Sequence, residues 1–167
     1  MAKKLTANAV NSAAKKTYKM TKCHLTDVNG EVWDVVVDTK MNPVKANEMA
    51  KDILIMCAKM HDEGVLEEFN IDEQYPVLLY PMIMRHFTDL EITDKESATE
   101  TLNSYVNLLE NLISLGLLEQ LMGCFEEDGM RNAMETFKEA SVKMSDHAIV
   151  EAMKIAKQAE EQPEEAE

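Results

Sequence analysis

The sequence predicts a mainly α-helical α+β domain, in which an N-terminal β-hairpin precedes a small helical bundle. Two segments rich in Val, Thr and aromatic residues flank Asn29-Gly30, a pattern typical of a hairpin. Several later segments repeat apolar residues at spacings of three and four, the period of an amphipathic helix. Only five Gly and four Pro occur in 167 residues, which argues against a loop-rich all-β domain.

A single domain is expected over residues 17–158, with the hairpin at 17–38 and the helical body at 42–158. A chain of this length buries about two-thirds of its unfolded surface, so its core needs no disulfides. Residues 1–24 hold six Lys and no acidic residue, and we interpret 1–16 as a disordered, flexible basic arm. Residues 159–167 contain five Glu and one Pro, which predicts a disordered acidic tail.

The register of the hairpin follows from its loop. A two-residue Asn29-Gly30 loop would place polar residues opposite the apolar side of the second strand. A three-residue loop, 28–30 with Gly30 left-handed, instead gives one coherent apolar face, so we prefer it. In this register Trp33, Val35 and Val37 form the buried face opposite Leu25, Cys23 and Thr21, and His24 faces Asp34 on the outer side.

Two helices are expected next. Asn42 can cap the first, Pro43 fits its first turn, and Gly64 is a plausible stop. Its apolar face consists of Met49, Ile53, Met56, Cys57 and Met60. The second is apolar nearly all round as far as Phe87, which indicates a central buried element. Pro76 suits its start, and Pro81 is expected to kink or break it.

Thr93 and Glu96 match a capping box and predict the start of the following helix. One face of this helix carries Ala98, Leu102, Tyr105, Leu109, Leu112 and Ile113. Gly116 interrupts the apolar stripe, which resumes with Leu117, Leu118, Leu121 and Met122. Two helices, or one bent near Gly116, are therefore expected, ending near Gly123.

The segments after residue 129 have few apolar anchors, so they predict weakly held helices. Thirteen Met occur in the chain. Met fills cores, and it also coats adaptable surfaces that bind apolar helices of varied sequence; both interpretations can hold here. The candidate partner-binding residues are Met130, Met134, Met144 and Met153.

Charge is spread unevenly along the chain. The formal net charge is −14, yet residues 25–167 alone carry 11 basic and 31 acidic side chains. Such a field repels nucleic acid and favours basic partners. It is explained either by solubility or by an acidic decoy that mimics DNA. No apolar run reaches the roughly 18 residues of a membrane helix, and three Cys without metal-site spacing indicate reduced thiols in a cytoplasmic protein.

Catalytic and cofactor motifs are absent from the sequence. The five Gly are isolated, so no phosphate-binding loop is formed, and no Ser lies in a G-x-S-x-G motif. The four His are far apart and form no helical metal pair. We therefore expect a binding protein without catalytic residues, metal or cofactor. A small enzyme would instead need a cleft that gathers His86 or His147 with distant carboxylates.

The organisation of residues 17–125 resembles the tail assembly chaperones of long-tailed bacteriophages. The central run has an apolar helix ending in Arg85-His86-Phe87-Thr88-Asp89, an R-x-x-T-D-like phrase, then a polar spacer and a Leu-rich helix. The resemblance implies a non-enzymatic protein of the host-cell cytoplasm that coats the helical tape-measure protein and hands it to the tail tube protein. A homo-oligomer is compatible with it. The alternative is an acidic inhibitor or DNA mimic that acts on a host or phage enzyme.

Overall fold

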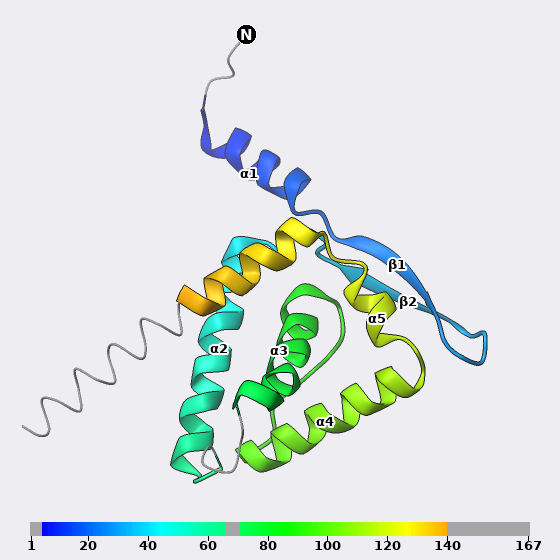
Figure 1. The fold of residues 1–167 in the computed structure, drawn as a ribbon. Coiled ribbons are helices and arrows are strands. Elements are labelled where there is room, and N and C mark those ends of the chain that lie inside the picture. The colour runs from blue at the N-terminus through cyan, green and yellow to red at the C-terminus, as the bar shows by residue number, and fades with distance from the viewer. Residues whose placement is uncertain (1–4, 66–70, 140–167) are drawn as a thin grey trace, which may run out of the picture.

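The computed structural model describes residues 5–65 and 71–139 and confirms a mainly helical fold with an N-terminal hairpin. A further helical segment follows at 127–139, up to the end of the described residues (Figure 1). The preceding elements, in chain order, are α1 (Ala7–Thr17), β1 (Thr21–Thr26), β2 (Val32–Val37), α2 (Pro43–Asp62), α3 (Ile71–Phe87), α4 (Ala98–Ser114) and α5 (Leu118–Met122).

Residues 1–16 were expected to form a disordered arm with at most a transient helix, and the described part of this arm instead contains the regular helix α1. The segment is rich in Ala, the best helix former, and Thr6 caps it by accepting a hydrogen bond from the Ala9 N–H at 3.2 Å. Lys15 and Lys16 lie in the last turn, where positive charge favours the helix dipole. The helix buries none of its residues and projects from the body (Figure 1).

The hairpin has the register expected for a three-residue loop. Cys23 pairs with Val35 and Leu25 with Trp33. The Asp27 N–H donates to the Glu31 carbonyl at 2.9 Å, and Gly30 has φ +84°. These contacts close a three-residue loop over 28–30, which confirms the loop predicted from the apolar face of β2.

The two faces of the hairpin are as expected except for the exposure of Trp33. His24 lies 2.5 Å from Asp34 on the outer side, and Val35 and Val37 are buried. Trp33 lies on the same side as these valines, where it lines a pocket with Leu25 and Val35, but it is 48% exposed and so is not buried as expected. It lies next to the turn, where its indole N–H donates to Asp27 at 3.2 Å. This hydrogen bond joins the indole to the Asp27 carboxylate, which is itself buried.

The helix α2 forms as expected. The Asn42 side chain accepts a hydrogen bond from the Val44 N–H at 2.9 Å, and Pro43 is the first helical residue. Met49, Ile53 and Met60 are buried on one face. The helix ends just before Gly64, whose φ of +72° suits a residue without a side chain.

The helix α3 differs from the predicted one at both prolines. It begins at Ile71, ahead of Pro76, and it continues through Pro81 without a break. Each proline removes a backbone hydrogen bond, at a cost of about 3 kcal/mol or more in a helix interior. Because α3 lies between α2 and α4 and buries Met82, Ile83 and Phe87 completely, packing offsets that loss (Figure 1).

The helix α4 begins at a different cap from the predicted one. Ser97, not Thr93, accepts the hydrogen bond from Glu100 N–H, at 3.1 Å. Both Thr93 and Ser97 begin an S/T-x-x-E pattern. The helix starts after Ser97 because the Glu63 carboxylate accepts a hydrogen bond from the Ala98 N–H, in the first turn, at 2.8 Å. Leu102, Tyr105 and Leu109 are buried as expected, whereas Ile113 is 63% exposed. The chain bends at Gly116 (φ +69°), and Gly123 ends α5, as predicted.

The hairpin is joined to the helices at the end of α3. The Asp38 N–H donates to the Phe87 carbonyl at 2.8 Å, and the Asp89 N–H donates to Val36 at 3.0 Å. The helical segment 127–139 is docked against the exit of the hairpin, since a Cβ atom at Gly129 would lie 2.8 Å from the Lys40 carbonyl oxygen. This close approach holds the start of the segment against the connection between β2 and α2.

Candidate functional site

Three adjoining pockets follow one side of α3, and together we call them the α3 groove. Tyr80 lines the first and second pockets, and Met134 lines the second and third. Their volumes are about 420, 650 and 390 Å³. The apolar lining comes from α3, from the α4–α5 region and from the segment 127–139: Tyr75, Leu79, Tyr80, Ile83, Ile113, Leu118, Met122, Phe125, Met130, Met134 and Phe137.

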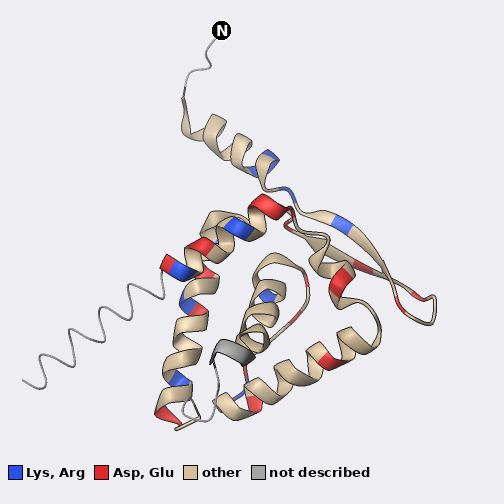
Figure 2. Ribbon diagram, in the orientation of Figure 1, with Lys and Arg blue, Asp and Glu red and all other residues tan. Residues whose placement is uncertain are grey.

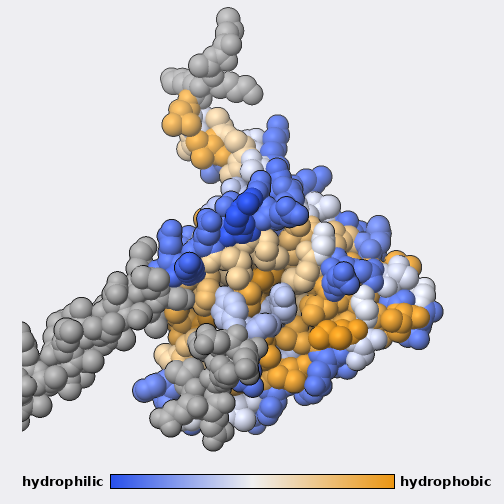
Figure 3. Space-filling view, in the orientation of Figure 1, coloured by the Kyte–Doolittle hydropathy of each residue, from blue (hydrophilic) through white to orange (hydrophobic). Residues whose placement is uncertain are grey.

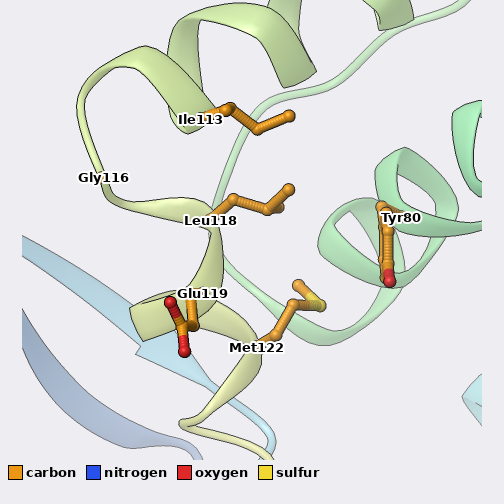
Figure 4. Close-up of a pocket in the computed structure, with 6 residues that line it drawn as sticks. All are labelled: Tyr80, Ile113, Gly116, Leu118, Glu119 and Met122. Atoms are coloured by element: carbon orange, nitrogen blue, oxygen red, sulfur yellow. The ribbon is translucent and has the colours of Figure 1, made fainter.

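The first pocket lies between α3 and the α4–α5 bend. The side chains of Ile113, Leu118 and Met122 extend toward Tyr80 across the pocket (Figure 4). Their direction follows from the bend, because Gly116 adopts a left-handed conformation and changes the chain direction between α4 and α5. A partner placed here would contact four apolar side chains from three helices.

The second and third pockets lie between α3 and the segment 127–139. Met130 and Met134 project from that segment beside Leu79 and Ile83. Tyr75 and Phe137 end this part of the groove with ring centroids 5.3 Å apart. Two flexible thioether side chains in one wall allow the groove to fit apolar surfaces of different shape.

Charged residues border the groove without filling it. Glu119, Glu127 and Glu135 each contribute to a different pocket, and Arg131 and Lys138 lie near the Met134 end. Acidic and basic residues alternate along the segment 127–139 (Figure 2). Apolar surface gathers on the face over α3 and α4, next to this hydrophilic border (Figure 3). The arrangement suits an amphipathic partner with polar residues outside and apolar residues inside.

Two of the four candidate partner-binding residues lie in this groove. Met130 and Met134 are both half-buried there. Met144 and Met153 lie outside the described residues, as does the acidic tail 159–167. The apolar periodicity assigned Ile113, Leu118 and Met122 to the core. It did not show that the bend at Gly116 directs these side chains into the first pocket beside Tyr80.

A polar network on the opposite side of α3 contains His86, one of the two histidines that a small enzyme would use; the other, His147, lies outside the described residues. The Tyr105 hydroxyl donates to Asp94 at 2.6 Å, and Arg85 donates to the same carboxylate at 2.9 Å. His86 Nε2 lies 3.0 Å from Asp52. Burial lowers the pKa of His86, and the Asp52 carboxylate opposes that shift. The network ties α2, α3 and α4 together.

The space beside this network is small. The pocket at Asp52, Arg85 and Asp94 measures about 80 Å³, room for a few water molecules. Within residues 5–65 and 71–139, no cluster of three or more metal-ligating side chains occurs. Nor does any helix in the described part of the chain have the length and apolar character needed to cross a bilayer.

Replacing Tyr75 with Phe is expected to leave the free energy of unfolding unchanged or to raise it by about 1 kcal/mol. The Tyr75 hydroxyl is buried without a hydrogen-bond partner among the described residues. Burial, with a smaller contribution from Cys57, raises the pKa of this hydroxyl to about 12, so the residue stays neutral near pH 7. Urea denaturation of both proteins measures the change, and a clear loss of stability would show that the hydroxyl has a partner.

Comparison with known proteins gives one match. Neither curated proteins nor solved structures show a similarity to this chain. The family model described as YomO matches residues 7–167, which include the hairpin, the helical body and every residue of the α3 groove. The chain therefore belongs to the YomO family.

Proposed function

We propose that this protein is a non-enzymatic chaperone that binds an amphipathic helix of a partner protein in the α3 groove. The observation that supports this most is the continuity of the groove, which runs over three apolar pockets from Ile113 to Phe137. Helix-in-groove binding uses apolar anchors about one helical turn apart. A Met-rich wall accepts such anchors with little demand on their sequence.

The partner that we propose is the tape-measure protein of a long-tailed phage, with the tail tube protein as a second partner. This choice rests on the sequence resemblance to tail assembly chaperones, in the cytoplasm of the infected host cell. A long helical protein exposes apolar faces before the tail tube encloses it. An excess of acidic residues on the bound chaperone would keep the complex soluble.

The Arg85–Asp89 phrase of that resemblance has structural contacts in this fold. Arg85 binds Asp94, and Asp89 accepts a hydrogen bond from the Val36 N–H at 2.9 Å. The Thr88 hydroxyl donates to the Met84 carbonyl at 2.6 Å. Residues 85–89 thus end α3 and attach the hairpin, so their contacts are structural in this protein. The choice of partner must be tested separately.

The direct test is co-expression with the tape-measure product of the same genome. We expect that product to move from the insoluble to the soluble fraction and to co-elute with the chaperone in size-exclusion chromatography. Expression of the tape-measure product alone is the control. If the product is equally insoluble with and without the protein, and no complex is recovered, the chaperone proposal fails and the acidic-inhibitor alternative becomes the leading one.

A further inference from the structure

The strand β1 and the chain around α5 lie against each other in antiparallel directions. The Gln120 side chain accepts from the Thr26 N–H at 3.0 Å and donates to the Thr26 carbonyl at 2.8 Å. It therefore satisfies both outward backbone groups of Thr26 at the open edge of the hairpin. Leu25 and Leu121, the neighbours of this pair, are both buried. Residues before Thr26 in β1 therefore lie beside residues that follow Gln120 in the chain.

Two cysteines meet by this alignment although 100 residues separate them in the sequence. Cys23 lies on the same side of β1 as Leu25, and Cys124 lies one helical turn beyond Gln120. The Cys124 thiol donates to the Gln120 carbonyl at 3.3 Å and also contacts the Cys23 side chain. Both residues are half-buried against the core, so neither thiol is sealed from solvent.

We propose that Cys23 and Cys124 are a redox site that closes to an intramolecular disulfide when the protein meets a small-molecule disulfide oxidant. The third cysteine, Cys57, lies on α2, whereas the pair joins β1 to the residues just after α5, so Cys57 has no part in it. The proposal rests on the β1–α5 alignment and is independent of the proposed chaperone function.

The reaction proceeds by two thiol–disulfide exchanges. The Cys23 thiolate attacks one sulfur of oxidised glutathione, the S–S bond breaks, and one glutathione leaves as a thiolate. Cys124 then loses its proton and attacks the Cys23 sulfur, which releases the second glutathione. The two protons from the cysteines reside on the two reduced glutathione molecules, so two protein thiols are oxidised and one glutathione disulfide is reduced.

The protonation of the thiols sets the pH dependence of these steps. Burial, together with the contact with Cys23, raises the pKa of the Cys124 thiol to about 12. Only a thiolate attacks a disulfide, so exchange is slow while a thiol of the pair keeps its proton. The rate of closure should therefore increase as the pH rises from 7 to 9.

The disulfide would fasten one wall of the α3 groove to the hairpin. Cys124 lies between Gly123 and Phe125, and both of these residues line the second pocket. A crosslink that closes so long a loop restricts the unfolded chain strongly. We expect the Tm of the oxidised protein to exceed that of the reduced protein by about 5–10 °C, since the native fold already aligns the two residues.

The experiment uses the full-length reduced protein and its Cys57→Ser variant, treated with oxidised glutathione and then alkylated. Peptide mapping should identify a Cys23–Cys124 linked peptide in both proteins, and reductant should reverse both the link and the rise in Tm. The Cys23→Ser and Cys124→Ser variants should give glutathione adducts without an intramolecular link. The proposal is overturned if the wild type gives only adducts, links to Cys57 or links between molecules, or if the Cys23–Cys124 link lowers the Tm.

Discussion

Replacing Phe87 with Ala is expected to lower the free energy of unfolding by about 3–5 kcal/mol. Phe87 is fully buried at the end of α3, where its carbonyl also accepts a hydrogen bond from Asp38 at 2.8 Å. The substitution removes the largest apolar side chain of α3 and leaves a cavity beside the hairpin junction. Urea denaturation followed by circular dichroism at 222 nm, the standard helix signal, measures the loss.

The matched control is Ile113→Ala. Ile113 is also an apolar helical residue, but it is 63% exposed, so its truncation should change stability by about 0.5 kcal/mol or less. Equal effects of the two substitutions would contradict the placement of the core between α2, α3 and α4.

Tyr105→Phe is expected to cost about 1.5–3 kcal/mol at neutral pH. The Tyr105 ring is buried, and its hydroxyl donates a 2.6 Å hydrogen bond to the Asp94 carboxylate. Removing the hydroxyl leaves the packing in place and takes one donor from a charged acceptor. Tyr105→Phe should lower the free energy of unfolding, whereas Tyr75→Phe should leave it unchanged or raise it. Both substitutions remove one hydroxyl oxygen, so the difference between them reports the hydrogen bond of Tyr105.

The effect of Tyr105→Phe should depend on pH. Partial burial would raise the pKa of Asp94, but the hydrogen bonds from Tyr105 and Arg85 outweigh it and lower that pKa below 3.8. A carboxyl with a lowered folded-state pKa stabilises the fold above its unfolded-state pKa, and this stabilisation is lost as the pH falls through the folded-state value. The difference in stability between wild type and variant should therefore be full at pH 7 and shrink below about pH 4. A constant difference from pH 7 to pH 3 would contradict this assignment.

The parts of the fold that could be predicted are those in which local chemistry and burial agree. The hairpin register follows from the pairing that gives β2 one apolar side, and Val35 and Val37 are buried on that side. Asn42 and Pro43 mark the start of α2, because Asn42 supplies the capping side chain and Pro43 fits the first turn. Gly116 is identified as a bend because the apolar stripe stops and resumes around it.

The parts that could not be predicted depend on tertiary contacts. The first turn of α4 has two possible caps, and the choice of Ser97 requires the Glu63 carboxylate from the end of α2. The continuity of α3 through Pro81 requires helices on either side of it. The 48% exposure of Trp33 likewise depends on tertiary contacts, which decide how much of the indole the helices cover.

The sequence pattern predicts only one wall of the groove. Met130 and Met134 stood out because they lie on a segment with few apolar anchors. Tyr80 and Met122, which face them, belong to apolar stretches that periodicity assigns wholly to the core. The apolar faces of α3 and α5 are wider than the neighbouring helices can cover. The apolar side chains that remain uncovered line the groove.

The most direct test of the account is whether a charge in the α3 groove prevents capture of the tape-measure product. Ile113→Glu places a carboxylate in the groove, and Val44→Glu places one on α2 away from it; the native side chains are 63% and 64% exposed, so both variants should fold. The measured quantity is the amount of soluble tape-measure product recovered with each variant on co-expression. We predict a loss of at least about tenfold with Ile113→Glu, because an unpaired carboxylate would be buried under the partner helix, and wild-type recovery with Val44→Glu. Equal recovery with both variants, at unchanged thermal stability, would contradict binding in the groove.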